Sequence, residues 1–138
     1  MALAGTAPSR SPLEVSRAVI TAAMKVHTVL GPGLLESAYE ACLAHELRKA
    51  HHKVECQLAL PIVYDGVHLD IGYRIDMVVD DVVVVEIKCV EALNYAHRKQ
   101  LLTYLRLTDL RLGYLLNFAE SLMKNGITRT VHHLTSTI

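Results

Sequence analysis

The chain has 138 residues with 14 basic and 14 acidic side chains, and 51% of it is apolar, which suffices for one domain with a buried core. A formal net charge of zero gives no overall basic field for nucleic acid or an anionic membrane, so any such contact needs a local patch. The three cysteines form no CxxC pair and no apolar run approaches the ~18 residues of a membrane span, so we expect a soluble, cytoplasmic protein.

The first part of the chain predicts a disordered segment followed by two helices. Residues 1–10 contain Gly, Pro, Ser and Thr but no apolar segment typical of a signal peptide, and we expect one domain over residues 11–138. Ser11-Pro12-Leu13-Glu14 predicts a helix start, with Ser as N-cap, Pro at the first helical position and Glu placed to close a capping box. This helix should end at Gly31-Pro32-Gly33, and a second helix should cover residues 34–50.

The middle of the chain predicts a meander of three strands, over residues 54–64, 67–79 and 82–88. Asp65-Gly66 and Asp80-Asp81 are turn signals, so neighbouring strands should pair antiparallel. The last strand is a run of valines without polar alternation, which is typical of a strand buried on both faces.

Two residues should disturb these strands, because Pro61 lacks a backbone donor and Gly72 favours a bulge or a close backbone approach. The remaining predicted elements are a third helix capped by Asn94 and reaching residue 107, a strand over 110–117, a turn at Asn125-Gly126 and a last strand over 128–134. This order predicts an α/β fold with a mixed sheet, in which the meander is antiparallel and the crossover strand is parallel to its neighbour.

Charged residues flank the predicted buried strand, at Asp76 and at Glu86-Ile87-Lys88. Burying a charge costs several kcal/mol unless the group is paired or bound to a metal, so these residues indicate a site. Side chains alternate along a strand, which places Glu86 and Lys88 on one face, and the tight turn brings Asp76 near Glu86 in register. Mg²⁺ usually binds one or two protein carboxylates and completes its coordination with water molecules, so Asp76 and Glu86 could hold it. The alternative is a strand-end ion pair, with Asp76 as a turn residue.

The predicted third helix carries a polar stripe. His97, Gln100 and Tyr104 lie at spacings that share one helical face, among apolar core candidates. The glutamine and the tyrosine could hold a phosphate or a nucleotide against the carboxylates. Alternatively, Gln100 is solvated and Tyr104 partly exposed. His27 and His97 could line the same cleft or be packed or solvated.

Taken together, these residues resemble the PD-(D/E)XK nuclease superfamily. The matches to its RecB-like branch, which has a downstream QxxxY motif, are Asp76, Glu86-Ile87-Lys88 and Gln100-Leu101-Leu102-Thr103-Tyr104, with Ile75 in place of the motif's proline. Gly33-Leu34-Leu35-Glu36-Ser37-Ala38-Tyr39 matches the signature of the GxxExxY family of small bacterial proteins. The resemblance implies a restriction-endonuclease-like core of one helix, a three-stranded meander, a crossover helix and a further strand. This chain would add an N-terminal helix and a short C-terminal strand.

The resemblance also implies roles for individual residues. Asp76 and Glu86 would be metal ligands, Lys88 the catalytic lysine, and Glu36 an additional catalytic acid and metal ligand. The implied substrate-binding residues are Gln100, Tyr104, Tyr39 and His97. Glu36 and Tyr39 are three residues apart and so share a helical face, although without the resemblance they would be interpreted as a surface glutamate and a core tyrosine.

The expected function is therefore Mg²⁺- or Mn²⁺-dependent phosphodiester hydrolysis of nucleic acid, with DNA favoured over RNA and no membrane partner. A chain of this size and zero net charge would bind a polyanion weakly, so it would act as a homo-oligomer or be recruited by a larger complex. The alternative is a catalytically silent nuclease-fold module that binds nucleic acid or a protein partner.

Overall fold

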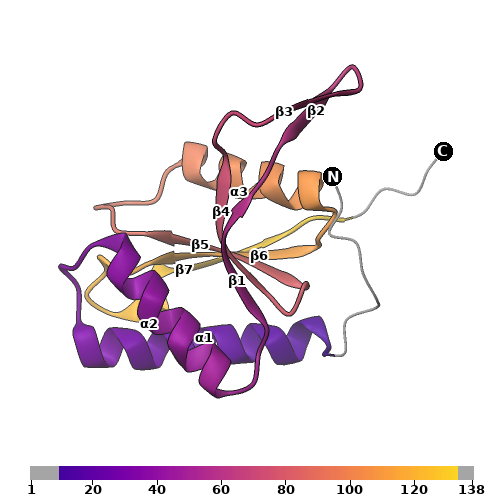
Figure 1. The fold of residues 1–138 in the computed structure, drawn as a ribbon. Coiled ribbons are helices and arrows are strands. Elements are labelled where there is room, and N and C mark those ends of the chain that lie inside the picture. The colour runs from indigo at the N-terminus through magenta and orange to yellow at the C-terminus, as the bar shows by residue number, and fades with distance from the viewer. Residues whose placement is uncertain (1–9, 134–138) are drawn as a thin grey trace.

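The computed structural model describes residues 10–133, so the expected disorder of residues 1–10 lies outside the described residues except at Arg10. Three helices cover a five-stranded sheet, with α1 and α2 on one face and α3 on the other (Figure 1). The elements in chain order are α1 (Pro12–Leu30), α2 (Glu36–Lys49), β1 (Val54–Ala59), β2 (Ile62–Tyr64), β3 (Val67–Leu69), β4 (Arg74–Val79), β5 (Val83–Lys88), α3 (Tyr95–Thr108), β6 (Leu112–Asn117), the 3-10 turn η1 (Met123–Gly126) and β7 (Ile127–Val131).

The helix boundaries follow local chemistry. Ser11 caps α1 by accepting a 3.2 Å hydrogen bond from the Glu14 N–H. The helix ends at Gly31, whose left-handed φ of 66° lets its N–H donate to His27 O. Asn94 caps α3 in a reciprocal capping box with His97. The predicted helices are therefore confirmed.

The sheet has the predicted mixed topology. Its strand order is β1-β4-β5-β6-β7, with β1, β4 and β5 antiparallel and β6 parallel to β5 after the α3 crossover. Asp80 and Asp81 both have left-handed φ angles, of 52° and 56°, in the turn between β4 and β5. The prediction of an α/β fold with a mixed sheet is correct.

Two predicted strands are each divided in the structure. The strand expected over 54–64 breaks at Pro61, and the strand expected over 67–79 breaks over residues 70–73. Gly72, with φ of 87°, lies in this second connection and not in a strand bulge. As a result β2 and β3 form a separate hairpin arm that projects from the body (Figure 1).

The core has two parts, one on each face of the sheet. Val83, Val85 and Ile87 of β5 pack with α1 and α2, whereas Val84 packs with Leu101 and other residues of α3. Because side chains alternate along β5, Glu86 and Lys88 follow Val84 onto the α3 side. Within the described residues, no helix is both long and apolar enough to cross a membrane.

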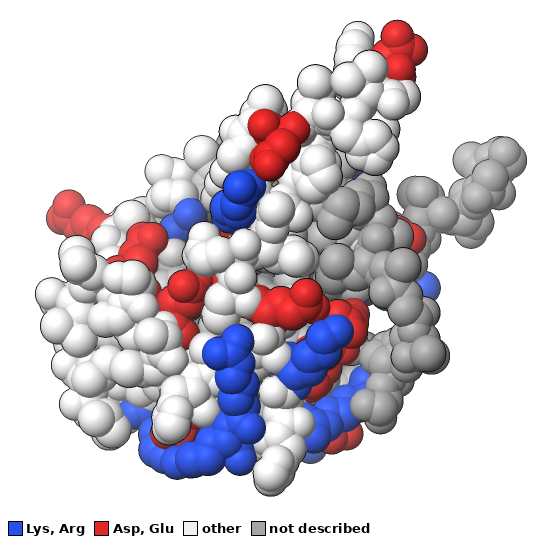
Figure 2. Space-filling view, in the orientation of Figure 1, with Lys and Arg blue, Asp and Glu red and all other residues white. Residues whose placement is uncertain are grey.

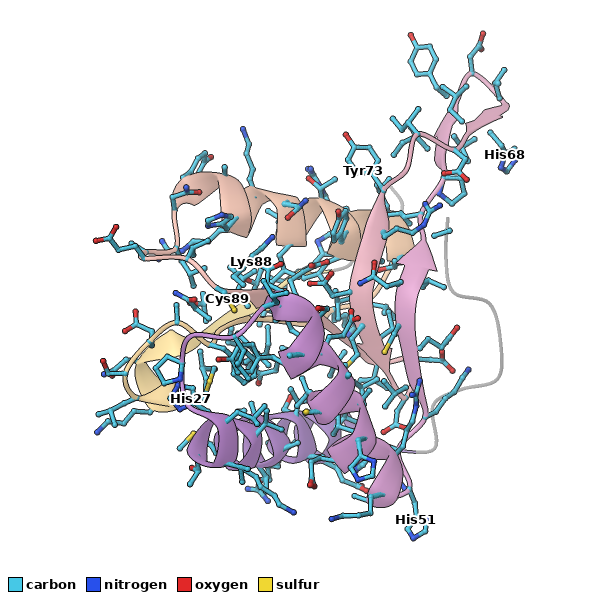
Figure 3. The ribbon with its side chains drawn as sticks, turned by 60° about the vertical axis from the view of Figure 1, so that its left-hand side comes forward. His27, His51, His68, Tyr73, Lys88 and Cys89 are labelled. Atoms are coloured by element: carbon cyan, nitrogen blue, oxygen red, sulfur yellow. The ribbon has the colours of Figure 1, made fainter. Side chains whose placement is uncertain are left out.

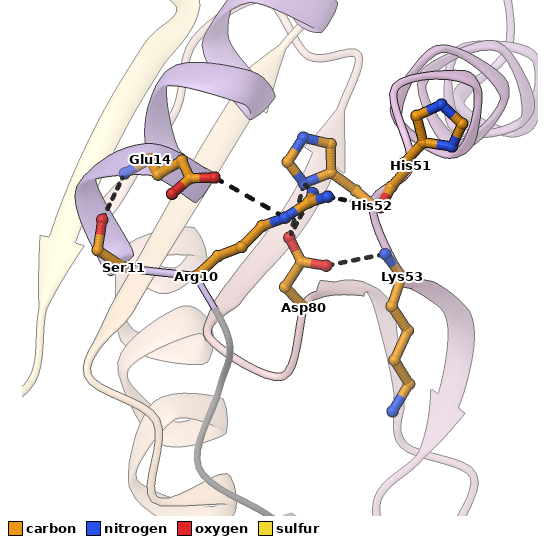
Figure 4. A network of polar contacts seen from close by, with 7 residues as sticks. All are labelled: Arg10, Ser11, Glu14, His51, His52, Lys53 and Asp80. Atoms are coloured by element: carbon orange, nitrogen blue, oxygen red, sulfur yellow. Dashed lines mark hydrogen bonds and ion pairs between the residues drawn. The ribbon is translucent and has the colours of Figure 1, made fainter.

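A polar network fastens three chain segments at the end of the sheet opposite Lys88 (Figure 4). Asp80 Oδ2 lies 2.6 Å from His52 Nδ1, and Asp80 Oδ1 accepts a 2.8 Å hydrogen bond from the Lys53 N–H. Arg10 Nη1 lies 3.5 Å from Asp80 Oδ2, and Arg10 Nη2 donates to His51 O at 2.8 Å. The network joins the residue before α1, the α2–β1 connection and the β4–β5 turn.

We predict that Asp80→Ala lowers the free energy of unfolding by about 1–3 kcal/mol more than Asp109→Ala. Asp109 has the same left-handed backbone, with φ of 61°, but its side chain makes no hydrogen bond with the described residues. The comparison therefore separates loss of the network from loss of a residue that tolerates this backbone. Urea unfolding monitored by circular dichroism would measure both variants, and equal losses would contradict the prediction.

Candidate active site

The site begins where β4 and β5 separate. The last backbone pair between these strands is Met77 with Val85, and the next position along each strand is Asp76 and Glu86. At this position a side-chain hydrogen bond replaces the backbone pairing, because Asp76 Oδ2 accepts a 2.8 Å hydrogen bond from the Ile87 N–H. Glu86 Oε1 lies 3.4 Å from the Asp76 backbone nitrogen. The predicted proximity of the two acids is thus present in the structure.

Glu86 is a buried acid beside another acid. Only 3% of the residue is exposed. Burial, and next the hydrogen bond and charge of Asp76, raise the pKa of Glu86 from 4.5 to about 9, while Lys88 acts in the opposite direction. With no added cation, the Glu86 carboxyl therefore holds its proton at neutral pH. A bound cation would favour the ionised form.

Lys88 is joined to the polar stripe of α3. Its Nζ donates a 3.2 Å hydrogen bond to Gln100 Oε1, and Gln100 Nε2 donates a 3.2 Å hydrogen bond to the Tyr104 hydroxyl oxygen. Burial, followed by the charges of Glu86 and Asp76, raises the pKa of Tyr104 to about 12, so its phenol stays neutral. These two hydrogen bonds fix the ammonium of Lys88 on the face of β5 that also carries Glu86.

Glu36 approaches the end of β5 from the other side of the sheet. It lies in the first turn of α2, and its Oε2 accepts a 3.1 Å hydrogen bond from the Cys89 N–H. Figure 3 shows Lys88 and Cys89 between α2 and α3. Glu36 lines a cleft of about 730 Å³ together with Leu34, Leu35, Ser37, Glu40, Gln57, Asp76, Ile87 and Cys89. On the face of the molecule that Figure 2 shows, acidic side chains gather near the middle and most basic side chains lie below them.

A family model described as the PD-(D/E)XK nuclease superfamily matches residues 13–130 of this chain. The chain belongs to the PD-(D/E)XK nuclease superfamily. Membership suggests nuclease activity and implies a nucleic acid substrate, and nucleases of this superfamily generally use divalent metals. The comparisons with curated proteins and with solved structures found no match.

In this PD-(D/E)XK chain, neither Tyr39 nor His97 lines the cleft, and both side chains bond to backbone groups beside their own helices. Tyr39 is fully buried and stacks on Phe118 at 4.4 Å between ring centroids. Its hydroxyl donates to Gly31 O at 2.5 Å and accepts from the Leu34 N–H at 3.1 Å, so it fixes the loop before Glu36. His97 Nδ1 accepts from the Asn94 N–H at 3.1 Å, which commits its ring to capping α3.

His27 does not contribute to the cleft either. The residue is 8% exposed, and its Nε2 lies 2.8 Å from Glu120 O, within hydrogen-bond distance. Figure 3 shows it well away from Lys88 and Cys89. Its packed alternative is therefore the one that the structure has.

Sequence reasoning missed two residues of the PD-(D/E)XK cleft. Gln57 Nε2 donates to Glu40 Oε1 at 2.6 Å and to Asp76 Oδ1 at 3.3 Å. Burial, partly offset by the Gln57 hydrogen bond, raises the pKa of Glu40. Glu40 lies four residues after Glu36 on α2 and so shares its helical face. That spacing was the available signal. Nothing in the local sequence distinguishes Gln57.

The donor set fits a hard cation held by few protein ligands. No group of three or more His, Cys, Asp or Glu side chains is placed to hold one metal ion within residues 10–133, so Glu36 does not complete a three-carboxylate cluster with Asp76 and Glu86. The pair alone matches Mg²⁺, which usually takes one or two carboxylates and keeps several waters. A buried carboxyl whose pKa is raised by burial and by an adjacent acid is suited to such an ion.

We predict that Glu86→Gln stabilises the metal-free protein at pH 7–8 by at least about 1 kcal/mol. In the unfolded chain Glu86 ionises near 4.5, but in the folded protein it stays protonated to about 9, so the folded state loses stability as pH rises between these values. The glutamine variant should lack this part of the decline. Thermal unfolding from pH 4 to 9 in a chelator would measure it.

The exposed Glu91→Gln variant is the matched control, because it removes a nearby acid outside the site. Its stability should follow that of the wild type across the whole range. Parallel wild-type and Glu86→Gln curves would show that Glu86 is not the group responsible.

Proposed function

We propose that this protein is a Mg²⁺- or Mn²⁺-dependent nuclease that hydrolyses phosphodiester bonds in DNA. The observation that carries the proposal is the contact between Asp76 and the buried Glu86, with Lys88 on the same strand face as Glu86. A binding module gains nothing from a buried carboxyl whose ionisation its neighbour opposes. That cost argues against a catalytically silent module.

Asp76 and Glu86 would hold the cation, and Glu36 would act from across the cleft through water. When bound, the cation would polarise a phosphate oxygen and lower the pKa of a water ligand. Glu36 also holds the Cys89 N–H, which fixes the end of β5 beside the cleft. Tyr39 would contribute by fixing the preceding loop and not by touching the substrate.

Lys88 would act on the phosphate and on the attacking water. In hydrolysis the water oxygen forms a bond to phosphorus while the bond from phosphorus to one sugar oxygen breaks, and negative charge grows on the remaining phosphate oxygens. The Lys88 ammonium would offset that charge and orient the water. Gln100 keeps the ammonium in place, and the neutral Tyr104 accepts from Gln100. We infer that holding the lysine ammonium in place is the role of the QxxxY motif.

The position of the motif residues supports a place in the GxxExxY family and in the RecB-like branch. Glu36 lines the cleft, Tyr39 fixes the loop that carries the glycine, and Gln100 accepts from Lys88 while donating to Tyr104. The contacts of Glu36 and Gln100 are with the end of β5, at Cys89 and Lys88, and those of Tyr39 are with the loop before α2. We therefore propose both assignments.

We predict that Glu86→Ala and Lys88→Ala each lower the cleavage rate at least about 100-fold, because the first removes a ligand of the cation and the second removes the positive charge that offsets the developing phosphate charge. Wild-type protein should cut single-stranded or duplex DNA with Mg²⁺ or Mn²⁺ and lose that activity in a chelator. Gel assays on labelled DNA and RNA of both forms would measure this, with Glu91→Gln as the control acid variant.

Each negative result has a distinct meaning. Wild-type protein that binds neither ion and cuts none of the substrates would refute the enzyme proposal. Activity that survives Glu86→Ala unchanged would refute the site while leaving the reaction class standing. Cleavage of RNA alone would overturn the choice of DNA.

A further inference from the structure

Gln57 has an unusual backbone for a residue of a strand. Its φ is 53°, in the left-handed region that glycine, asparagine and aspartate adopt more readily than glutamine. The residue lies within β1, between Cys56 and Leu58, which pair with Met77 and Ile75 of β4. Gln57 and its opposite residue Asp76 form no backbone pair, although the register continues unbroken on both sides.

The strands change faces at this unpaired position. Cys56 and Met77 pack with the core on the α1 and α2 side, whereas Leu58 and Ile75 pack with the core on the α3 side. Residues two apart on a regular strand would share a face. The left-handed turn at Gln57 therefore brings its side chain over the cleft beside Asp76, at a conformational cost that a glycine would avoid.

The Gln57 amide uses both its protons on carboxylates. Nε2 donates to Glu40 Oε1 at 2.6 Å and to Asp76 Oδ1 at 3.3 Å, and a primary amide has two donors on that atom. The reversed amide would direct its oxygen at two acids, so this orientation is the favourable one. Glu40, one helical turn after Glu36, thereby anchors the amide to α2.

Both oxygens of Asp76 are consequently held. Oδ2 accepts from the Ile87 N–H at 2.8 Å and Oδ1 accepts from Gln57. Rotation of the carboxylate would break one of these bonds. Its remaining lone pairs are thus directed before any ligand arrives, which is the usual task of groups placed behind a metal ligand.

We propose that Gln57 is a positioning residue for Asp76 and that Glu40 holds the Gln57 amide in the orientation that this task needs. The inference rests on the proposed function, in which Asp76 holds the cation. The hydrogen bonds from Gln57 to Glu40 and Asp76 join α2, β1 and β4. The inference explains these bonds, which involve two residues, Glu40 and Gln57, outside the sequence motifs.

Gln57→Gly separates positioning from folding. Glycine adopts the left-handed backbone without strain, so the metal-free variant should unfold at the wild-type temperature or above it. Its affinity for Mn²⁺, measured by paramagnetic resonance of the free ion, should fall about 10–100-fold, and its rate of DNA cleavage should fall with it. His51→Gly is the matched control, because His51 is an exposed left-handed residue with φ of 69° away from the cleft. It should bind Mn²⁺ like the wild type.

Two variants of Glu40 test its part. Glu40→Gln keeps an acceptor for the Gln57 amide and should lose less Mn²⁺ affinity than Glu40→Leu, which keeps none. Equal affinities of the two variants, or a Gln57→Gly protein with wild-type Mn²⁺ affinity, would overturn the inference. A Gln57→Gly protein that unfolds at a clearly lower temperature would also overturn it, since the residue would then be structural.

Asp76→Asn distinguishes this inference from the proposed function. If the wild type binds Mn²⁺ and Asp76→Asn does not, while Gln57→Gly binds normally, only the positioning role is wrong. If the wild type binds no Mn²⁺, the proposed function is wrong and the inference falls with it.

Discussion

The constraint on which the site depends is the approach of two carboxyls in a gap where one strand pair has ended. Asp76 and Glu86 are the first positions that β4 and β5 leave without backbone pairing, and the Glu86 side chain is almost fully buried. Water cannot screen their repulsion well there, so a proton stays on Glu86. The surrounding polar groups compensate, through the Ile87 N–H and Gln57 on Asp76 and through the positive charge of Lys88.

Sequence reasoning recovered what short-range signals determine. Caps, turns and the valine run located the helices, the β4–β5 hairpin and the crossover, because each depends on a few neighbouring residues. The same signals brought Asp76 to Glu86, since the hairpin register follows from its turn. They also placed Glu86 and Lys88 on one face. The sequence placed Lys88 on a strand and Gln100 on a helix, and the structure adds the hydrogen bond between them.

The wrong and missing predictions share one physical cause, which is that tertiary packing between elements cannot be read from local sequence. The strands expected over 54–64 and 67–79 continued into the hairpin arm because its residues are apolar, yet Val63, Tyr64 and Val67 are exposed. A helical pattern cannot tell which strand will cover Glu40, and Gln57 carries no sequence signal for its left-handed backbone. Tyr39 fits both the motif and the core. Only the structure shows that its hydroxyl serves the backbone of a loop.

The break in pairing after Met77 and Val85 also bears on the order in which the site can assemble. Asp76 and Glu86 are ten residues apart, whereas the contact from Glu36 to Cys89 spans 53 residues. Closing a short loop costs less chain entropy than closing a long one, so the hairpin can bring its two acids together before α2 docks. The growing hairpin therefore meets their repulsion early. A cation held by both acids would favour closure of the hairpin, which couples its binding to folding as well as to chemistry.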